Sequence, residues 1–272
     1  MKVLVTGGAG FIGSHTCLSL IEKGHEIVVI DSFVNSRKKS IQGVIGLSKS
    51  NNLIKNINIK LINIDIRDDA KLEKIFLEAE RLGKQFDAVI HFAGLKSVKD
   101  SVLNPLIYWD VNVNGSIKLF SIMNKYNCKT IVFSSSASVY GVQNEIPILE
   151  NSEIKPVNPY GETKAAVEQL LTDLYYGSNK GWRIANLRYF NPIGAHASGR
   201  IGEDPIGVPN NIFPFITQVA SGYRSKLTIF GNNWPTKDGT AIRDYIHVMD
   251  LADGHISALE YLVENQNQNE NK

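Results

Sequence analysis

The stretch that decides the fold is VLVTGGAGFIGSH, residues 3–15 of the 272-residue chain. Its apolar start predicts a short buried strand, and a helix is expected to open at Ser14. Between them lie Gly8-x-Gly10-x-x-Gly13 and the overlapping Gly7-x-x-Gly10-x-x-Gly13. Such glycines permit a sharp turn, close approach of backbone to a pyrophosphate, and close packing of helix on strand. Because a helix N-terminus also offers free N–H groups to phosphates, the pattern predicts a dinucleotide-binding unit.

An acidic residue ends the next predicted strand. Residues 27–30 are all isoleucine or valine, and Asp31 follows directly. A carboxylate there can accept both hydroxyls of an adenosine ribose and would repel a 2′-phosphate, so the sequence predicts NAD rather than NADP. The alternative is an ordinary strand–turn–helix with a surface aspartate.

Composition excludes several classes of protein. The formal net charge is only +2, which gives no bias toward nucleic acid or a membrane surface. Cys17 and Cys128 lie far apart, with no CxxC pair or histidine cluster, so neither a disulfide framework nor a metal site is predicted. No signal peptide and no run of membrane-spanning length is recognised. A cytoplasmic protein is expected.

The rest of the chain alternates between strand and helix patterns. Further strands are predicted at 59–64, 88–92 and 129–133, and helices at 69–82, 106–126 and from 250 to 263. This alternation predicts an α/β fold with a doubly wound parallel sheet, of the Rossmann type, and a smaller C-terminal region. Residues 194–211 are rich in Gly, Pro, His and Asn and are predicted to form a long functional loop.

Polar residues follow three of these strands, where ligands bind in open α/β sheets. Asp65 can meet an adenine amino group, or it can cap the next helix. Lys96 can reach phosphates or ribose, or point into solvent. Residues 134–136 are three serines, which form either a ligand-binding edge or a plain turn. Asn112 lies inside a predicted helix, where its amide needs a partner.

A second decisive stretch is NPYGETK, residues 158–164. Asn158 suits an N-cap and Pro159 the first helical position, which places Tyr160 and Lys164 on one helix face. A tyrosine hydroxyl has an ordinary pKa near about 10 and is a poor base at neutral pH. A nearby ammonium and a cationic nicotinamide ring would favour the phenolate and lower the pKa of Tyr160. A chance Tyr-x-x-x-Lys spacing is the alternative.

Taken together, the motifs resemble one family. They are TGGAGFIGSHT (6–16), HFAGLK (91–96), SSSASVYG (134–141), Tyr160 with Lys164, LRYFNP (187–192), GAH (194–196) and RDYIHVMD (243–250). This set resembles the UDP-glucose 4-epimerase family, extended short-chain dehydrogenases/reductases, from Met1 to about Val263. The resemblance implies interconversion of UDP-glucose and UDP-galactose in galactose metabolism. It also implies a homodimer paired through helices 106–126 and 165–176.

The resemblance also implies a set of site residues. Tyr160 is the base, Lys164 its partner, and Ser136 a hydrogen-bond donor to the sugar O4. The NAD-binding residues are Gly7, Gly10, Phe11, Ile12, Gly13, Asp31, Asn35, Ser36, Asp65, Ile66, Phe92, Ala93, Lys96, Asn112, Ser134, Tyr160, Lys164 and Tyr189. The residues that contact the UDP-sugar are Lys96, Ser136, Tyr160, Asn191, Asn211, Phe230, Arg243 and Tyr245.

The implied reaction is a reversible oxidation. Tyr160 removes the O4 proton while the C4 hydride passes to NAD, and the keto sugar turns over before the hydride returns. Two alternatives stay open: another nucleotide-sugar epimerase, dehydratase, decarboxylase or reductase, or a non-catalytic NAD-binding protein. Dehydratases of this superfamily carry an acid just after the serine/threonine position, where this chain has Ala137 and Ser138.

Three parts of the chain are expected. Residues 1–185 form the NAD-binding domain, residues 186–263 a UDP-sugar-binding region, and residues 264–272 a polar disordered tail. The family continues for several tens of residues beyond this region, and that stretch completes the substrate half. The chain as it stands is therefore expected to bind NAD well and UDP-sugars weakly.

Overall fold

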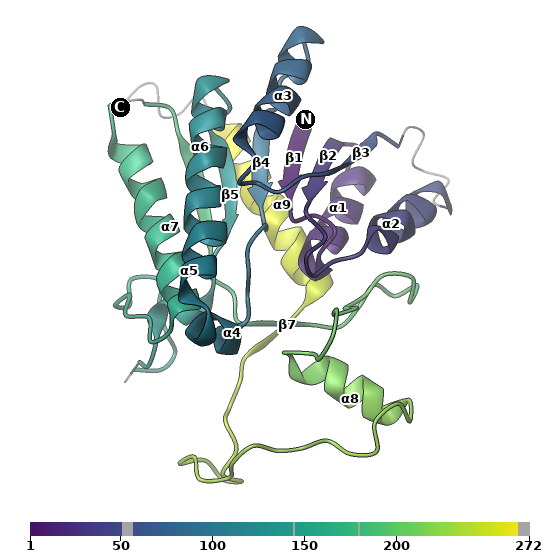
Figure 1. Ribbon diagram of the computed structural model, residues 1–272, viewed down its shortest axis with the longest axis vertical. Helices are drawn as coiled ribbons and strands as arrows, with labels where there is room; N and C mark the ends of the chain where they lie inside the picture. The colour runs from purple at the N-terminus through teal and green to yellow at the C-terminus, as the bar shows by residue number, and fades with distance from the viewer. Residues whose placement is uncertain (51–56, 144, 179, 266–272) are drawn as a thin grey trace.

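The molecule is organised around one parallel sheet, seen in a computed structural model that describes residues 1–50, 57–143, 145–178 and 180–265. Six strands lie in the order β3-β2-β1-β4-β5-β6 (Figure 1). They are β1 (Lys2–Thr6), β2 (Glu26–Asp31), β3 (Ile59–Asn63), β4 (Ala88–His91), β5 (Thr130–Ser134) and β6 (Arg183–Leu187). This order confirms the predicted doubly wound fold, and it reverses between β1 and β4, where ligands bind at the carboxyl ends of the strands.

Helices cover both faces of the sheet. One face carries α1 (Phe11–Glu22), α2 (Lys38–Ser50) and α9 (Val248–Glu264), and the other carries α3 (Asp69–Arg81), α6 (Gly115–Lys125) and α7 (Pro159–Tyr176) (Figure 1). Alternate strand residues enter the two cores. Val5 packs in the cluster that includes α1 and α9, whereas Leu4 packs in the cluster that includes α3, α6 and α7. Burial on both sides explains why these strands read as continuous apolar runs.

Two helices differ from the predictions by more than two residues or by an interruption. Helix α1 begins at Phe11, three residues before Ser14, because Gly10 is its N-cap and carries no side chain that would signal the start. The predicted helix 106–126 is three pieces: α5 (Pro105–Tyr108), a π-helical turn Trp109–Asn114, and α6, which ends at Lys125. Such π-helical turns inside helices frequently occur at functional sites.

The chain beyond β6 leaves the sheet and then returns to it. Strands β7 (Asn191–Ile193) and β8 (Tyr245–His247) form a small parallel pair, and α8 (Ile212–Ala220) lies apart from the main sheet (Figure 1). Residues 194–211 contain neither helix nor strand, as predicted for the loop. Helix α9 then packs against α1, burying Ile256. Residues from the predicted 186–263 region therefore cover part of the main sheet.

The predicted domain limits stay a prediction. Of the proposed tail, Glu264 is the last residue of α9, and residues 266–272 lie outside the described residues. Among the helices that the structure describes, none has the length and apolar character needed to cross a membrane.

Candidate active site

The glycine turn between β1 and α1 lies against the end of β4. Gly7 has φ +67°, and a Cβ on it would lie 2.6 Å from the Ala93 nitrogen. A Cβ on Gly13 would lie 2.6 Å from the Gly7 oxygen, so this glycine lets α1 press on the turn. No side chain caps α1 at Gly10, and no acidic residue occupies its first turn, which holds Phe11 and Ile12. The N–H groups there suit the pyrophosphate of a dinucleotide.

Asp31 ends β2 in a largely buried position beside this turn. Its Oδ2 accepts from the Ala9 nitrogen at 2.9 Å. Its Oδ1 accepts from the Phe33 nitrogen at 2.9 Å and from Ser36 Oγ at 2.7 Å. A carboxylate has about four acceptor positions, so one on Oδ2 remains for a ribose hydroxyl. Accepting both hydroxyls would require Asp31 to release a protein bond. Asn35, in the same loop, is exposed.

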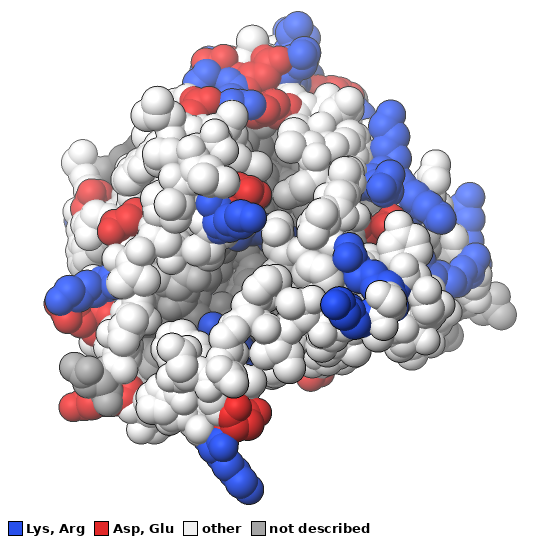
Figure 2. Space-filling model, turned by 60° about the horizontal axis from the view of Figure 1, so that its bottom comes forward, with Lys and Arg blue, Asp and Glu red and all other residues white. Residues whose placement is uncertain are grey.

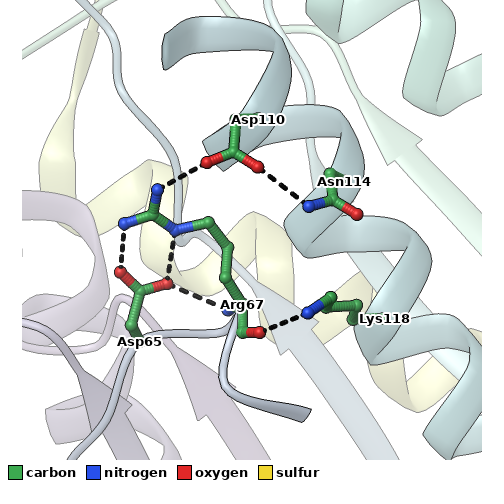
Figure 3. Close-up of polar contacts among 5 residues, drawn as sticks. All are labelled: Asp65, Arg67, Asp110, Asn114 and Lys118. Carbon is green, nitrogen blue, oxygen red and sulfur yellow. Dashed lines mark hydrogen bonds and ion pairs between the residues drawn. The ribbon is translucent and has the colours of Figure 1, made fainter.

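Asp65, predicted to meet adenine, is held by an arginine (Figure 3). Arg67 Nε and Nη2 donate to its two carboxylate oxygens at 3.0 and 2.6 Å, and these bonds lower the pKa of Asp65. Arg67 Nη1 also donates to Asp110 at 2.6 Å, and Asn114 donates to the other Asp110 oxygen at 2.8 Å. Lys118 Nζ donates to the Arg67 carbonyl at 2.7 Å. The alternative that Asp65 caps α3 is wrong, because the cap is Asp68. Ile66 beside it is buried in the core.

Asn112, in the π-helical turn, joins the end of β4 to α7. Its Oδ1 accepts from the Leu95 nitrogen at 2.8 Å, and its Nδ2 donates to the Leu95 carbonyl and to Thr163 Oγ1, both at 3.0 Å. The prediction that this amide has partners is confirmed. Nearby, the rings of Phe92 and His255 lie 4.7 Å apart, centroid to centroid.

Glu203, in the loop 194–211, joins residues predicted for the two ligands. Its Oε1 accepts from Asn211 Nδ2 at 2.6 Å and lies 3.5 Å from Lys96 Nζ. Only 11% of the Glu203 side chain is exposed. Sequence reasoning missed this glutamate.

Helix α7 brings Tyr160 and Lys164 to the end of β5. Asn158 caps it as predicted, accepting from the Gly161 nitrogen at 2.9 Å. Lys164 is 5% exposed, and its Nζ donates to the Ser134 carbonyl at 2.7 Å. This Nζ lies 5.9 Å from the centroid of the Tyr160 ring. Burial lowers the pKa of Lys164 to about 8, although Glu168 acts in the opposite direction.

The predicted lowering of the Tyr160 pKa is wrong for the protein alone. Burial raises the pKa of this phenol, and it outweighs the effect of Ser136, which lowers it. Desolvation disfavours the charged phenolate. The Lys164 ammonium, 5.9 Å from the centroid of the ring, does not cancel that effect. The cationic nicotinamide ring stays a predicted source of the opposite effect.

Four hydroxyl groups gather around this end of the sheet. Ser136 lies beside the Tyr160 hydroxyl and lowers the pKa of that phenol, and its Oγ accepts from the Ser138 nitrogen at 3.1 Å. Ser134 Oγ is hydrogen-bonded to Tyr189 Oη, and burial raises the pKa of Tyr189. The Ser-rich stretch is therefore more than a turn, because each of the two outer serines lies beside a half-buried tyrosine.

The residues predicted to bind UDP lie farther from one another than those around Tyr160 and Lys164, and several are exposed. Asn191 donates from its backbone and its side chain to the Asp244 carbonyl, at 3.3 and 2.9 Å, so it lies beside Tyr245 in the β7–β8 pair. Arg243 is exposed, and Phe230 is 90% exposed. The face that carries the strand ends is hollowed, and Figure 2 views the molecule from that side. Phe230 is not packed into a formed pocket among the described residues.

The fold and these contacts define a class of protein, the dinucleotide-dependent enzymes of the short-chain dehydrogenase/reductase type. Comparison with known proteins is more specific. Residues 3–270 match the family description "NAD dependent epimerase/dehydratase family", and the chain belongs to that family.

Individual relatives support the assignment. The chain is 53% identical to UDP-glucose 4-epimerase 2 of Arabidopsis thaliana over 96% of its own length and 72% of that protein. It is 50% identical to UDP-glucose 4-epimerase of Bacillus subtilis (strain 168), over 96% of this chain and 73% of the relative. A crystal structure of UDP-glucose 4-epimerase from Bifidobacterium longum in complex with NAD+ and UDP matches with a TM-score of 0.88 and 42% identity. That match covers 96% of this chain and 74% of the other.

Proposed function

We propose that this chain interconverts UDP-glucose and UDP-galactose, with NAD as its resident cofactor. The observation that carries the proposal is the placement of Tyr160 beside Ser136 and buried Lys164, at the carboxyl end of β5. Relatives that share half of its residues are UDP-glucose 4-epimerases, and one solved relative holds NAD+ and UDP.

The side chains divide the work of this reaction. NAD, when bound, supplies the acceptor and donor of the C4 hydride. Tyr160 Oη takes the proton from the sugar O4 and later returns it, so proton and hydride leave together and return together with no net oxidation. Ser136 orients the O4 hydroxyl toward Tyr160. Lys164 supplies positive charge that favours the phenolate.

We also propose which residues bind NAD and the UDP-sugar. The glycine turn, Asp31 and the Asp65 carboxylate suit the pyrophosphate, ribose and adenine of NAD. The remaining cofactor contacts that we propose are Asn35, Ser36, Ile66, Phe92, Ala93, Lys96, Asn112, Ser134 and Tyr189. The proposed UDP contacts are Asn191, Asn211, Phe230, Arg243 and Tyr245. We also propose a cytoplasmic location, with which the free, buried Cys17 and Cys128 agree.

A product assay tests this function. The purified protein is incubated with UDP-galactose and the sugar signals are followed by NMR. UDP-glucose is the expected product. A dehydrated 4-keto-6-deoxy sugar would assign the chain to a different reaction of the same family, and no conversion would favour the non-catalytic alternative.

NAD is expected to bind at least about tenfold more tightly than NADP, a difference of about 1.4 kcal/mol. The largely buried Asp31 carboxylate is held by three protein donors and cannot turn away readily from a 2′-phosphate. Calorimetric titration of the cofactor-free protein with each dinucleotide measures the ratio. Equal dissociation constants would contradict this role of Asp31.

We also expect a homodimer. Apolar side chains on α4 (Val98–Leu103), α5 and α6 are exposed, among them Leu103 at 66%, Leu106 at 84% and Ile117 at 45%. Exposed apolar side chains on neighbouring helices suit burial against a second copy of the chain. Light scattering should give twice the chain mass, and Leu106→Glu should give the monomer mass. A monomeric parent across the micromolar range would refute the pairing.

A further inference from the structure

An ion pair between a buried glutamate and a half-buried arginine lies one helical turn beyond Lys164. Glu168 of α7 is 3% exposed. Arg188 Nε donates to both of its oxygens at 3.0 Å, and Arg188 Nη2 donates to Oε2 at 2.6 Å. Ser135 Oγ donates to Glu168 Oε1 as well. The carboxylate therefore has a donor for nearly every acceptor position that it offers.

The arginine is fixed on its other side. Its Nη1 donates to Tyr140 Oη at 3.0 Å and to the Glu150 carbonyl at 2.8 Å. Its guanidinium carbon lies 5.2 Å from the centroid of the Tyr140 ring. One ion pair thus ties α7, the segment after β5 and the segment after β6 together.

Each of those segments carries a residue of the proposed active site. Ser135 stands between Ser134, whose carbonyl accepts from Lys164, and Ser136, which lies beside Tyr160. Arg188 directly precedes Tyr189, which is bonded to Ser134. Glu168 contacts none of the reacting atoms, but it reaches these residues through their immediate neighbours.

We propose that the Glu168–Arg188 ion pair is a positioning unit, which fixes the two active-site serines through Ser135 and maintains positive charge on Lys164. This rests on the proposed function for the roles of the serines and Lys164. Stability alone does not account for the pair, because buried ion pairs often contribute no more than apolar residues of similar volume.

Glu168 lies one turn from Lys164 on α7, and the charge paired with it is that of Arg188. On the same helix Tyr160 faces Lys164, and from β4 comes His91, which is neutral because burial lowers its pKa to about 3. From β5 come the Ser134 carbonyl and the ring of Phe133, whose centroid lies 4.9 Å from Lys164 Nζ. Removing the Glu168 charge should therefore lower the pKa of Lys164 below about 8.

The test compares Glu168→Gln with Glu162→Gln. Glu162 is an exposed glutamate on the same helix, two residues from both Tyr160 and Lys164. The titration of Lys164 is followed by NMR in cofactor-free protein labelled at lysine, with the signal assigned through Lys164→Arg. We expect its midpoint to fall by about one pH unit in Glu168→Gln and to stay in place in Glu162→Gln.

Turnover gives the second readout. In Glu168→Gln the alkaline limb of kcat should move to lower pH and kcat should fall, while the KM for UDP-galactose stays within about threefold. An unmoved Lys164 midpoint, or an equal shift in Glu162→Gln, would overturn the electrostatic role. Because the NMR arm needs no substrate, it is decided even if the parent protein has no epimerase activity.

Ser135→Ala covers the case in which Glu168→Gln does not fold. It retains both charges and removes only the hydroxyl that holds the serine segment. We expect kcat to fall about tenfold, as for a small misplacement of catalytic groups, with the Lys164 midpoint unchanged. Parental kcat in Ser135→Ala would overturn the positioning role.

Discussion

Tyr160→Phe is expected to lower the turnover of UDP-galactose by about 10²–10⁴-fold, the usual contribution of a positioned general base. The substitution removes only the hydroxyl that would take the O4 proton. The ring keeps its place at the start of α7, where Asn158 and Pro159 hold the backbone. NAD should bind with unchanged affinity, and the measurements are initial rates with calorimetry of cofactor binding.

Tyr176→Phe is the matched control. This tyrosine lies at the other end of α7 and is 80% exposed, so losing its hydroxyl should change neither turnover nor binding. Because no hydrogen bond within 3.5 Å among the described residues is lost with the Tyr160 hydroxyl, Tyr160→Phe should change the free energy of unfolding by no more than about 1 kcal/mol. Turnover within a few-fold of the parent would remove Tyr160 from the chemistry.

The parts of the fold that could be predicted depend on neighbours in sequence. The glycine turn, the acid at the end of β2 and the cap of α7 each lie within a few residues, and a local pattern is enough to place them. The start of α1 has no such local pattern. Its N-cap is Gly10, which has no side chain that could mark the position. The doubly wound sheet followed from the alternation of strands and helices.

The ion pairs of the site could not be predicted in this way. Arg67 meets Asp110 and Arg188 meets Glu168 across separations of 43 and 20 residues, and no spacing rule joins such positions. Glu203 likewise reaches Lys96 from a loop without regular structure. Each contact joins a residue that follows a strand of the main sheet to a helix or loop far away in the sequence.

The state of Tyr160 was misjudged because a pKa depends on burial as well as on charge. The sequence indicates that Lys164 lies one turn away on the same helix, but not how far the fold removes each group from water. Desolvation raises the pKa of the acid and lowers that of the base, which opposes the expected help from the ammonium. The buried lysine is therefore a cost to the fold, and that cost can be measured.

Lys164→Met is expected to reduce turnover at least about 100-fold and yet to stabilise the cofactor-free protein at neutral pH. The pKa of Lys164 is about 8 in the folded protein, against 10.5 for a lysine that is fully hydrated, as in the unfolded chain. At pH 7 both states carry the proton, and the folded state bears the full cost of a buried charge, up to about 3 kcal/mol. Methionine avoids this cost and fills similar space. After the loss of the Ser134 bond, a gain of about 1–2 kcal/mol should remain.

The dependence of stability on pH distinguishes removal of a buried charge in Lys164→Met from a general improvement in packing. Between about pH 8 and 10.5 the unfolded state binds more protons than the folded state, so the parent becomes more stable as pH rises. The advantage of Lys164→Met should therefore shrink from about pH 7 to about pH 10 in urea unfolding of both proteins. Lys74→Met, at a lysine on the surface helix α3, should change little at either pH. Two results would contradict this prediction: a Lys164→Met variant less stable than the parent at neutral pH, or a stability difference that does not change with pH. Either would show that burying the Lys164 ammonium does not destabilise the folded protein.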